Sequence, residues 1–272
     1  MFYSPKLLNY TPSLLSEGGK SSWPYFDSKY FNASTLAGTG LSLGDMFYLT
    51  SPAIANYVYN GANAFMVVKA SEGLAVGNLV TYSAPTAVTV TTTSTNYRVD
   101  FTTSPLTAGA EVGNLVYVNN ATTQMLRVIK ENATGTVTVS KRDPLNPSTA
   151  ATNLDADVFD TVPANSDPAC IIRPFNVRLC TAALRPIGVA LGTVTSGYYT
   201  IIQVAGLAMV STVGSGTATV VGVPAVPGAS ANILGSGGTA SSYAEAVSMI
   251  PLYAWNGAAR LTPCFVNFMA SA

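Results

Sequence analysis

The chain has 272 residues, of which 48% are apolar and only 10% are charged, and its 13 basic and 13 acidic residues give zero net charge. A neutral, charge-poor surface lacks the basic patch that nucleic acid or an anionic membrane requires, and it favours a protein whose surface is covered by partners. The chain also has no histidine, which removes the commonest general base and the commonest metal ligand. The composition therefore favours a structural protein over an enzyme, and it predicts neither a cofactor nor a metal.

Residues 1–65 differ from the rest of the chain because aromatic residues are dense there and no helical or alternating pattern is sustained. Such a segment must bury its aromatic side chains against something. It is either an extended strap over the protein's own β core or an arm laid on a neighbouring subunit, where Tyr, Trp and Phe are preferred anchors. Both interpretations stay open. The candidate partner-binding residues are Phe2, Tyr3, Tyr10, Trp23, Tyr25, Phe26, Tyr30 and Phe31.

Residues 66–142 are predicted to form a β domain, organised around a repeated motif. Gly-Leu-Ala-Val-Gly-Asn-Leu-Val at residues 73–80 recurs as Gly-Ala-Glu-Val-Gly-Asn-Leu-Val at residues 109–116. Gly and Asn both tolerate positive φ, and the apolar run after them suits a strand entering a core. No Gly-Lys-Ser/Thr follows either copy, so a phosphate-binding loop is disfavoured. The motif is interpreted as an architectural turn-plus-strand unit.

Other segments of this domain are rich in Thr and Val, which favour strands because β-branched side chains pack well on a pleated surface. Residues 87–92 and 97–101 are predicted to form a hairpin. Residues 124–130 and 135–140 are predicted to form a second hairpin.

Residues 143–168 are predicted to be an acidic, Pro-containing loop or linker, because the composition shifts there. Asp155, Asp157 and Asp160 could supply carboxylate oxygens to calcium, but their spacing departs from the EF-hand pattern. A solvated loop is the favoured interpretation.

Residues 169–272 are predicted to be a second β domain or the second half of a single one. Residues 186–210 read as strand, Gly-bearing turn and strand. Residues 242–250 could form a short helix that Pro251 ends. The stretch 186–259 carries a single charge, at Glu245.

The three cysteines, Cys170, Cys180 and Cys264, fit neither a disulfide framework nor a zinc site, because their number is odd and their spacing unrelated. They are predicted to be buried free thiols of a reducing compartment, with a Cys170–Cys180 bridge as the alternative. The N-terminus lacks the pattern of a secretory signal, and the longest apolar run, at residues 201–213, is too short and interrupted to span a bilayer. We therefore expect a protein that is made and used without crossing a membrane.

Residues 186–210 resemble the small β-barrel signature of tailed-phage capsid decoration (cement) proteins. Ile-Gly-Val-Ala, a Gly-containing turn and Ile-Ile-Gln-Val-Ala-Gly-Leu-Ala are the residues that carry the resemblance, together with the Gly-x-x-Val-Gly-Asn-Leu-Val turns at 73–80 and 109–116. It covers about residues 66–82, 109–118 and 186–235. It implies a homo-oligomer, usually a trimer, on the outer surface of a virion, bound to the major capsid protein. The family has no catalytic residues to transfer.

The leading hypothesis is thus a mainly β structural virion protein, with antiparallel barrel or sandwich units and an irregular N-terminal arm, that stabilises a capsid by bridging neighbouring capsomers. The alternative is an adhesive or carbohydrate-binding module such as a head-fibre or baseplate part. Less favoured are a major capsid protein, since no long amphipathic helix is seen, and a glycan depolymerase. The depolymerase would need a carboxylate pair such as Asp155 with Asp160, or Asp100 with Glu111.

Overall fold

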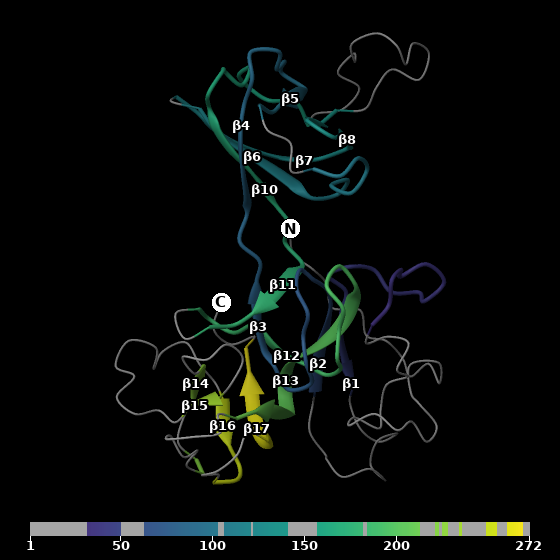
Figure 1. The fold of residues 1–272 in the computed structure, drawn as a ribbon, viewed down its shortest axis with the longest axis vertical. Coiled ribbons are helices and arrows are strands. Elements are labelled where there is room, and N and C mark those ends of the chain that lie inside the picture. The colour runs from purple at the N-terminus through teal and green to yellow at the C-terminus, as the bar shows by residue number, and fades with distance from the viewer. Residues whose placement is uncertain are drawn as a thin grey trace. The chain divides into compact units, whose positions relative to one another are not determined.

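The structure is a computed structural model that describes residues 32–49, 63–102, 106–120, 122–140, 157–181, 184–212, 221–222, 225–227, 234–235, 249–254 and 260–268. The predicted fold class is confirmed, because the chain is mainly β and these residues contain no helix (Figure 1). The chain divides into two compact units. Met1–Tyr82 and Phe175–Ala272 together form one, here called the barrel unit, and Ser83–Pro174 forms the other, the inserted unit.

The barrel unit is built on a ring of five strands. These are β2 (Asn63–Ala70), β11 (Asn176–Leu179), β3 (Leu79–Tyr82), β12 (Gly188–Ala190) and β13 (Tyr199–Ser211). Each pairs with the next and β13 pairs back with β2; only the β2–β11 pair is parallel. Closure into a barrel leaves these strands with few free backbone groups at an edge, which protects them from unwanted pairing.

Alternate residues of the ring strands point into the barrel. Ala64, Met66 and Val68 of β2 are buried there with Val80 of β3 and Ile202 of β13. This alternation is the period-2 pattern of a strand that separates a core from another environment.

A second buried cluster lies on the other side of β3 and β12, where Leu79 and Val189 pack with Met249, Cys264 and Val266. The last three belong to β16 (Met249–Pro251) and β17 (Leu261–Asn267), which continue the sheet from the second half of β13. β1 (Met46–Leu49) pairs with β2, and β14 (Val226–Pro227) pairs with β15 (Leu234–Gly235).

A bulge marks the point where β13 exchanges β2 for β17 as its partner. The register shifts between Gln203 and Ala205. The fully buried Gln203 amide donates to Asn63 Oδ1 (3.1 Å) and to the carbonyls of Ala205 (3.1 Å) and Leu207 (3.0 Å). This amide therefore satisfies acceptors that the interrupted ladder would leave buried without a donor.

The inserted unit is a sandwich of two antiparallel sheets. One sheet has the order β4 (Thr86–Thr89), β10 (Pro168–Ile172), β6 (Leu115–Asn119) and β7 (Gln124–Val128). The other has the order β5 (Arg98–Asp100), β9 (Thr136–Thr138) and β8 (Glu131–Ala133). Side chains from both sheets form one core, for example Val88 and Val116 from the first and Val99 and Val137 from the second.

The insertion starts and ends at neighbouring strands of the barrel. Residue Tyr82 of β3 pairs with Val177 of β11, and the chain between them forms the inserted unit. The division therefore differs from the predicted domains at 66–142 and 169–272. The segment 143–168 is not a linker between domains in the described part, because Phe159 is buried in the core of the inserted unit.

The two predicted hairpins are also corrected. Residues 87–92 and 97–101 pair over a short stretch, where Val90 bridges to Phe101 and the Thr91 N–H donates to the Asp100 carbonyl (2.8 Å), but their strands β4 and β5 then continue into different sheets. Residues 124–128 pair with β6, and residues 136–138 form their hairpin with residues 131–133, although the Lys130 N–H still donates to the Thr138 carbonyl (2.8 Å). The consecutive strands β4 and β5, and likewise β7 and β8, are thus divided between the two layers of the sandwich, since this lets each strand bury one face in a common core.

The repeated Gly-Asn motif forms the same turn in both units. In residues 75–78 the last N–H donates to the first carbonyl (3.1 Å), and in residues 111–114 the corresponding bond is 3.0 Å. Gly77 has φ 80° and Gly113 has φ 86°, whereas neither asparagine is in the left-handed region. Only the glycine therefore adopts the positive φ that the turn requires, whereas the sequence suggested that both the glycine and the asparagine could do so.

Three further turns of this form precede strands: residues 42–45 before β1, 164–167 before β10 and 195–198 before β13. The first two were missed in the sequence. Residues 164–167 were missed because Ser166, with φ 69°, occupies the position of the glycine. The signal at residues 42–45 was Gly44-Asp45, a close variant of Gly-Asn.

Candidate functional site

The eight predicted partner-binding aromatics, Phe2 to Phe31, lie outside the described residues. Two parts of the predicted arm are described: residues 32–49, which pack on their own barrel, and residues 63–65, which begin β2. Ala33 bridges to Tyr199 through two backbone hydrogen bonds of 2.8 and 3.0 Å, and Asn32 Oδ1 accepts from the Thr195 N–H (2.8 Å). Leu41 is buried. For these residues the strap interpretation is therefore the correct one.

The carboxylates that a hydrolytic site would need have other partners. Asp157 pairs with Lys130 (2.8 Å) and Asp160 pairs with Arg127 (3.0 Å), so two members of the predicted acidic triplet contact different cations. Asp155 lies outside the described residues. No group of three potential metal ligands occurs within the part of the chain that the structure describes.

Asp100 is held by donors on all sides. Arg98 donates from Nε to Oδ1 (2.9 Å) and from Nη2 to Oδ2 (2.5 Å), and the hydroxyls of Thr93 (2.6 Å) and Thr136 (2.8 Å) also donate to the carboxylate. Burial by itself would raise the pKa of Asp100, but these hydrogen bonds and the charge of Arg98 outweigh burial and lower the pKa. A carboxylate that is ionised and fully occupied in this way stabilises the fold and is a poor general acid.

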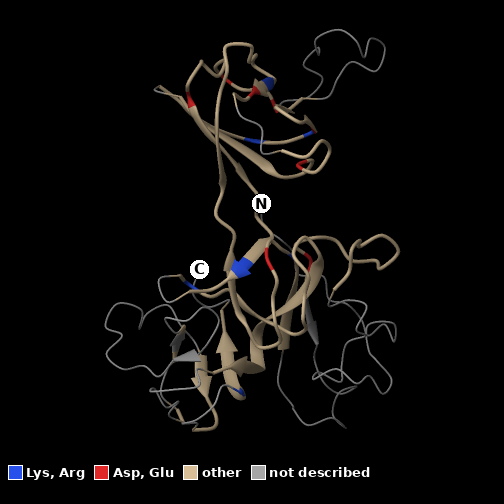
Figure 2. Cartoon of the chain, in the orientation of Figure 1, with Lys and Arg blue, Asp and Glu red and all other residues tan. Residues whose placement is uncertain are grey.

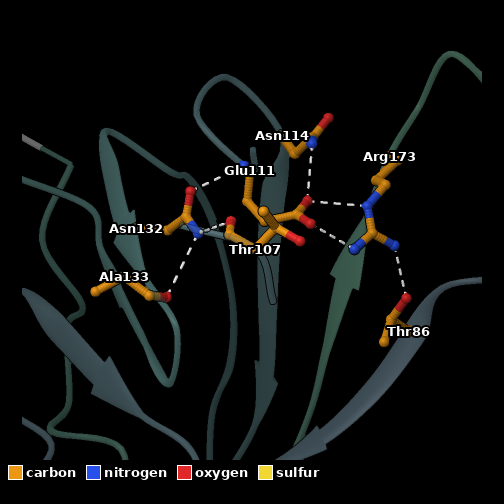
Figure 3. A network of polar contacts seen from close by, with 7 residues as sticks. All are labelled: Thr86, Thr107, Glu111, Asn114, Asn132, Ala133 and Arg173. Carbon is orange, nitrogen blue, oxygen red and sulfur yellow. Dashed lines mark hydrogen bonds and ion pairs between the residues drawn. The ribbon is translucent and has the colours of Figure 1, made fainter. Parts of the chain in front are cut away.

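Glu111 is the centre of a second network (Figure 3). Its carboxylate accepts from Arg173 Nη2 (2.6 Å), Arg173 Nε (2.9 Å) and Asn114 Nδ2 (3.0 Å), and its own N–H donates to Asn132 Oδ1 (2.8 Å). Arg173 also donates to Thr86 Oγ1 (2.6 Å). Thr86 lies on β4, the first strand of the inserted unit, and Arg173 directly follows β10, its last strand. The bidentate ion pair between Arg173 and Glu111 therefore links both strands to the repeated turn at residues 111–114.

Asp100 and Glu111 therefore belong to separate networks, each neutralised by its own arginine. The structure brings neither carboxylate to the other as a catalytic pair. Arg98 lies two residues from Asp100 on the same strand, so the alternation of that strand already places the two side chains on one face. Arg173 and Asn132 were assigned no role from the sequence, because their partner Glu111 is distant from both along the chain.

The three cysteines are free, as predicted. Cys180 and Cys264 are buried, and burial raises the pKa of each thiol to about 12. Cys170 is partly buried on β10, and burial raises the pKa of its thiol as well. Thiols with raised pKa values are weak nucleophiles at neutral pH.

Charge is divided unequally between the two units (Figure 2). Of the 26 charged residues in the sequence, 14 lie between Ser83 and Pro174, a segment that makes up about a third of the chain. The barrel unit is correspondingly poor in charge. A low-charge exterior is a property of surfaces that contact other proteins, because charged residues are depleted in the centre of interfaces.

The barrel unit exposes apolar side chains on β16 and β17 and just after β16. Ile250 and Phe265 face each other across the strand pair and are 39% and 41% exposed. Leu252 and Tyr253 follow at 45% and 53%. Among residues 249–254 and 260–268, only Arg260 carries a charge. We call Ile250, Leu252, Tyr253 and Phe265 the β16–β17 surface, and it is the candidate functional site.

No helix among the described residues has the length and apolar character needed to cross a membrane. No known protein-family model, curated protein or solved structure matches this chain.

Proposed function

We propose that the chain is a structural virion protein that decorates the outer surface of a phage capsid and stabilises it by bridging neighbouring capsomers. Its partner is the major capsid protein, and it acts as a homo-oligomer, in keeping with the trimers of the family that it resembles. It is assembled in the host cytoplasm and has no catalytic role.

One observation carries this proposal. Two of the three segments that resemble decoration proteins, at about residues 66–82 and 186–235, contain β3, β12 and β13, which are neighbouring strands of one small closed barrel. Val80 pairs with Gly188, and Val189 pairs with Gln203. Segments that are far apart in sequence thus combine in the kind of fold that the resemblance implies. The remaining segment, residues 109–118, repeats the turn in the inserted unit and is not part of this barrel.

The mechanism follows from the charge-poor barrel unit. Burial of the β16–β17 surface against a shell protein would contribute about 25 cal/mol per Å² of apolar area, before the costs of association are subtracted. A single contact of this kind is weak, but an oligomer that presents several copies at once gains avidity because later contacts form at high effective concentration. Bridging follows when those copies contact different capsomers.

The test uses capsids assembled from the shell protein of the same genome and lacking this chain. We expect the full-length protein to co-sediment with them to a saturating ratio and to raise the temperature at which they open. Leu252→Lys should weaken binding about 10- to 100-fold, because a lysine at the centre of an apolar contact must be desolvated without a partner. Val112→Lys is the matched control, since Val112 is 54% exposed but lies in the inserted unit.

Failure of the wild-type protein to bind at about 100 µM would refute the proposal, since even millimolar contacts give measurable occupancy when several act together. Binding by Leu252→Lys equal to wild type would refute the assignment of the β16–β17 surface. Binding to a glycan array instead of capsids would support the adhesive alternative.

A further inference from the structure

The outward face of the four-stranded sheet of the inserted unit is free of charge. Burial alternates along all four strands, and the register places the less buried residues of each strand side by side. The buried residues between them, such as Val88, Val118 and Met125, point into the sandwich core. We call the outward side the β4–β7 face, after the two outer strands of its sheet. It consists of Ala87, Thr89, Leu115, Tyr117, Asn119, Gln124, Leu126, Val128, Pro168, Cys170 and Ile172.

This composition is unusual for the outside of a β-sandwich. Antiparallel sheets with one solvated face normally alternate apolar and polar residues, whereas a continuous apolar run is typical of a strand that is covered on both faces. β6 begins Leu-Val-Tyr-Val and β10 ends Cys-Ile-Ile. The inserted unit is otherwise the charge-rich part of the chain, and Arg127, the one charged residue on these four strands, is opposite the buried Val116 and not on this face. The contrast within one unit indicates that the β4–β7 face is a contact surface.

The arrangement of side chains on the face identifies a fitting occupant. One row crosses the sheet as Ala87, Cys170, Tyr117 and Leu126, so side chains are small on β4 and β10 and large on β6 and β7. A two-fold axis parallel to the strands, between β10 and β6, would set Ala87 of one copy opposite Leu126 of another and Cys170 opposite Tyr117. In this row large side chains then meet small ones. In the next row Ile172 would lie opposite Leu115, which is a contact between two large apolar side chains, and in neither row does a charge meet a like charge.

We propose that the β4–β7 face is a self-association surface, at which the inserted units of two copies of this chain pack face to face. Sheets that pack in this way lie about 10 Å apart with nearly aligned strands, as in the halves of a sandwich. This contact does not depend on the proposed capsid binding. If both hold, it would link neighbouring decoration oligomers to one another.

The experiment compares full-length wild type with Leu126→Lys by light scattering over a range of concentrations. Leu126 is 48% exposed, so a lysine there is compatible with folding. The two-fold contact would bring two lysines into an apolar interface, and we expect self-association to weaken about 100-fold. The assembly should fall to half the wild-type mass, whatever the number of chains in it. Val112→Lys, an exposed position off the face, should keep the wild-type mass.

Ala87→Lys, at the other end of the row, is a second variant that should give the same halving if Leu126→Lys fails to fold. Cys170 supplies an independent readout: its maleimide labelling should be slow in wild type and at least 10-fold faster in the half-mass variants. A wild-type monomer at every concentration would overturn the proposal. A lysine variant with the same mass as wild type would also overturn the proposal. If Cys170 remained protected from maleimide in that variant, the face would be covered by residues of its own chain and not by a second copy. If wild type failed to bind capsids but still had twice the mass of the lysine variants, only the proposed function would be refuted.

Discussion

Gly77→Ala should destabilise the barrel unit much more than Gly197→Ala, although both glycines occupy the same place in the same kind of turn. Their φ angles are 80° and 85°. An L-residue in this region costs roughly 1–2 kcal/mol, and alanine recovers about 0.4–1 kcal/mol by restricting the unfolded chain. Strain alone therefore predicts a net loss of about 1 kcal/mol at either position.

The two sites differ in their surroundings. A Cβ on Gly197 would meet nothing within 4 Å, whereas a Cβ on Gly77 would collide with Leu261 Cδ2 and lie 2.8 Å from the Ser211 backbone nitrogen. The leucine side chain can move, but the backbone of β13 is held by its pairing with β17. Overpacking of this kind typically costs a further 1–3 kcal/mol. The expected loss for Gly77→Ala is therefore about 3 kcal/mol.

Urea unfolding followed by circular dichroism measures both variants, and hydrogen exchange of peptides from β13 assigns the transition to the barrel unit. With an m-value of about 2 kcal/mol per molar, the Gly77→Ala midpoint should lie about 1 M below that of Gly197→Ala. Equal midpoints would show that close packing at Gly77 adds nothing to backbone strain, and this would refute the reasoning.

Three further outcomes are expected. Glu111→Gln should destabilise the inserted unit by about 2–3 kcal/mol in urea unfolding, because it leaves the largely buried Arg173 without its counter-charge. The folded-state pKa of Asp100 is lowered, so its contribution is present above the unfolded value of about 3.9 and is lost as pH falls through the lower folded value. Stability of the inserted unit should thus drop below about pH 4, and Asp100→Asn should flatten this drop. Cys180 and Cys264 are fully buried and burial raises the pKa of each thiol to about 12, so intact-mass analysis at pH 8 should find them unlabelled by maleimide until denaturant is added.

Each outcome has its own control. Asp160→Asn should barely alter either the stability or its acid dependence, because the Asp160 side chain is 76% exposed and its pair with Arg127 is a surface one. A stability loss in Glu111→Gln no larger than in Asp160→Asn would contradict the role given to the Glu111–Arg173 pair. If Asp100→Asn lost as much stability below about pH 4 as wild type does, Asp100 would not be the cause of the acid dependence. A mass two protons short of the reduced chain would reveal a disulfide and overturn the free-thiol assignment.

The sequence by itself determined the local features. Thr- and Val-rich alternation predicted the β class, and Gly-Asn before an apolar run predicted the turns at residues 75–78 and 111–114, because these preferences reside in one short segment. The odd count of cysteines predicted free thiols. These predictions needed no knowledge of distant partners.

Only the tertiary structure decided which segments are neighbours. The barrel closes because β13 pairs with β2, across more than a hundred residues, and the inserted unit begins where β3 meets β11. Such pairings depend on which faces can be buried together, and a strand carries no local signal of its partner. The same reason explains the carboxylates. Asp100 and Glu111 could be read as a pair from the sequence, but each carboxylate has other donors. Arg98 lies beside Asp100 on the same strand, whereas Arg173 reaches Glu111, and Thr136 reaches Asp100, only through folding, since a buried carboxylate is stable only where donors converge on it.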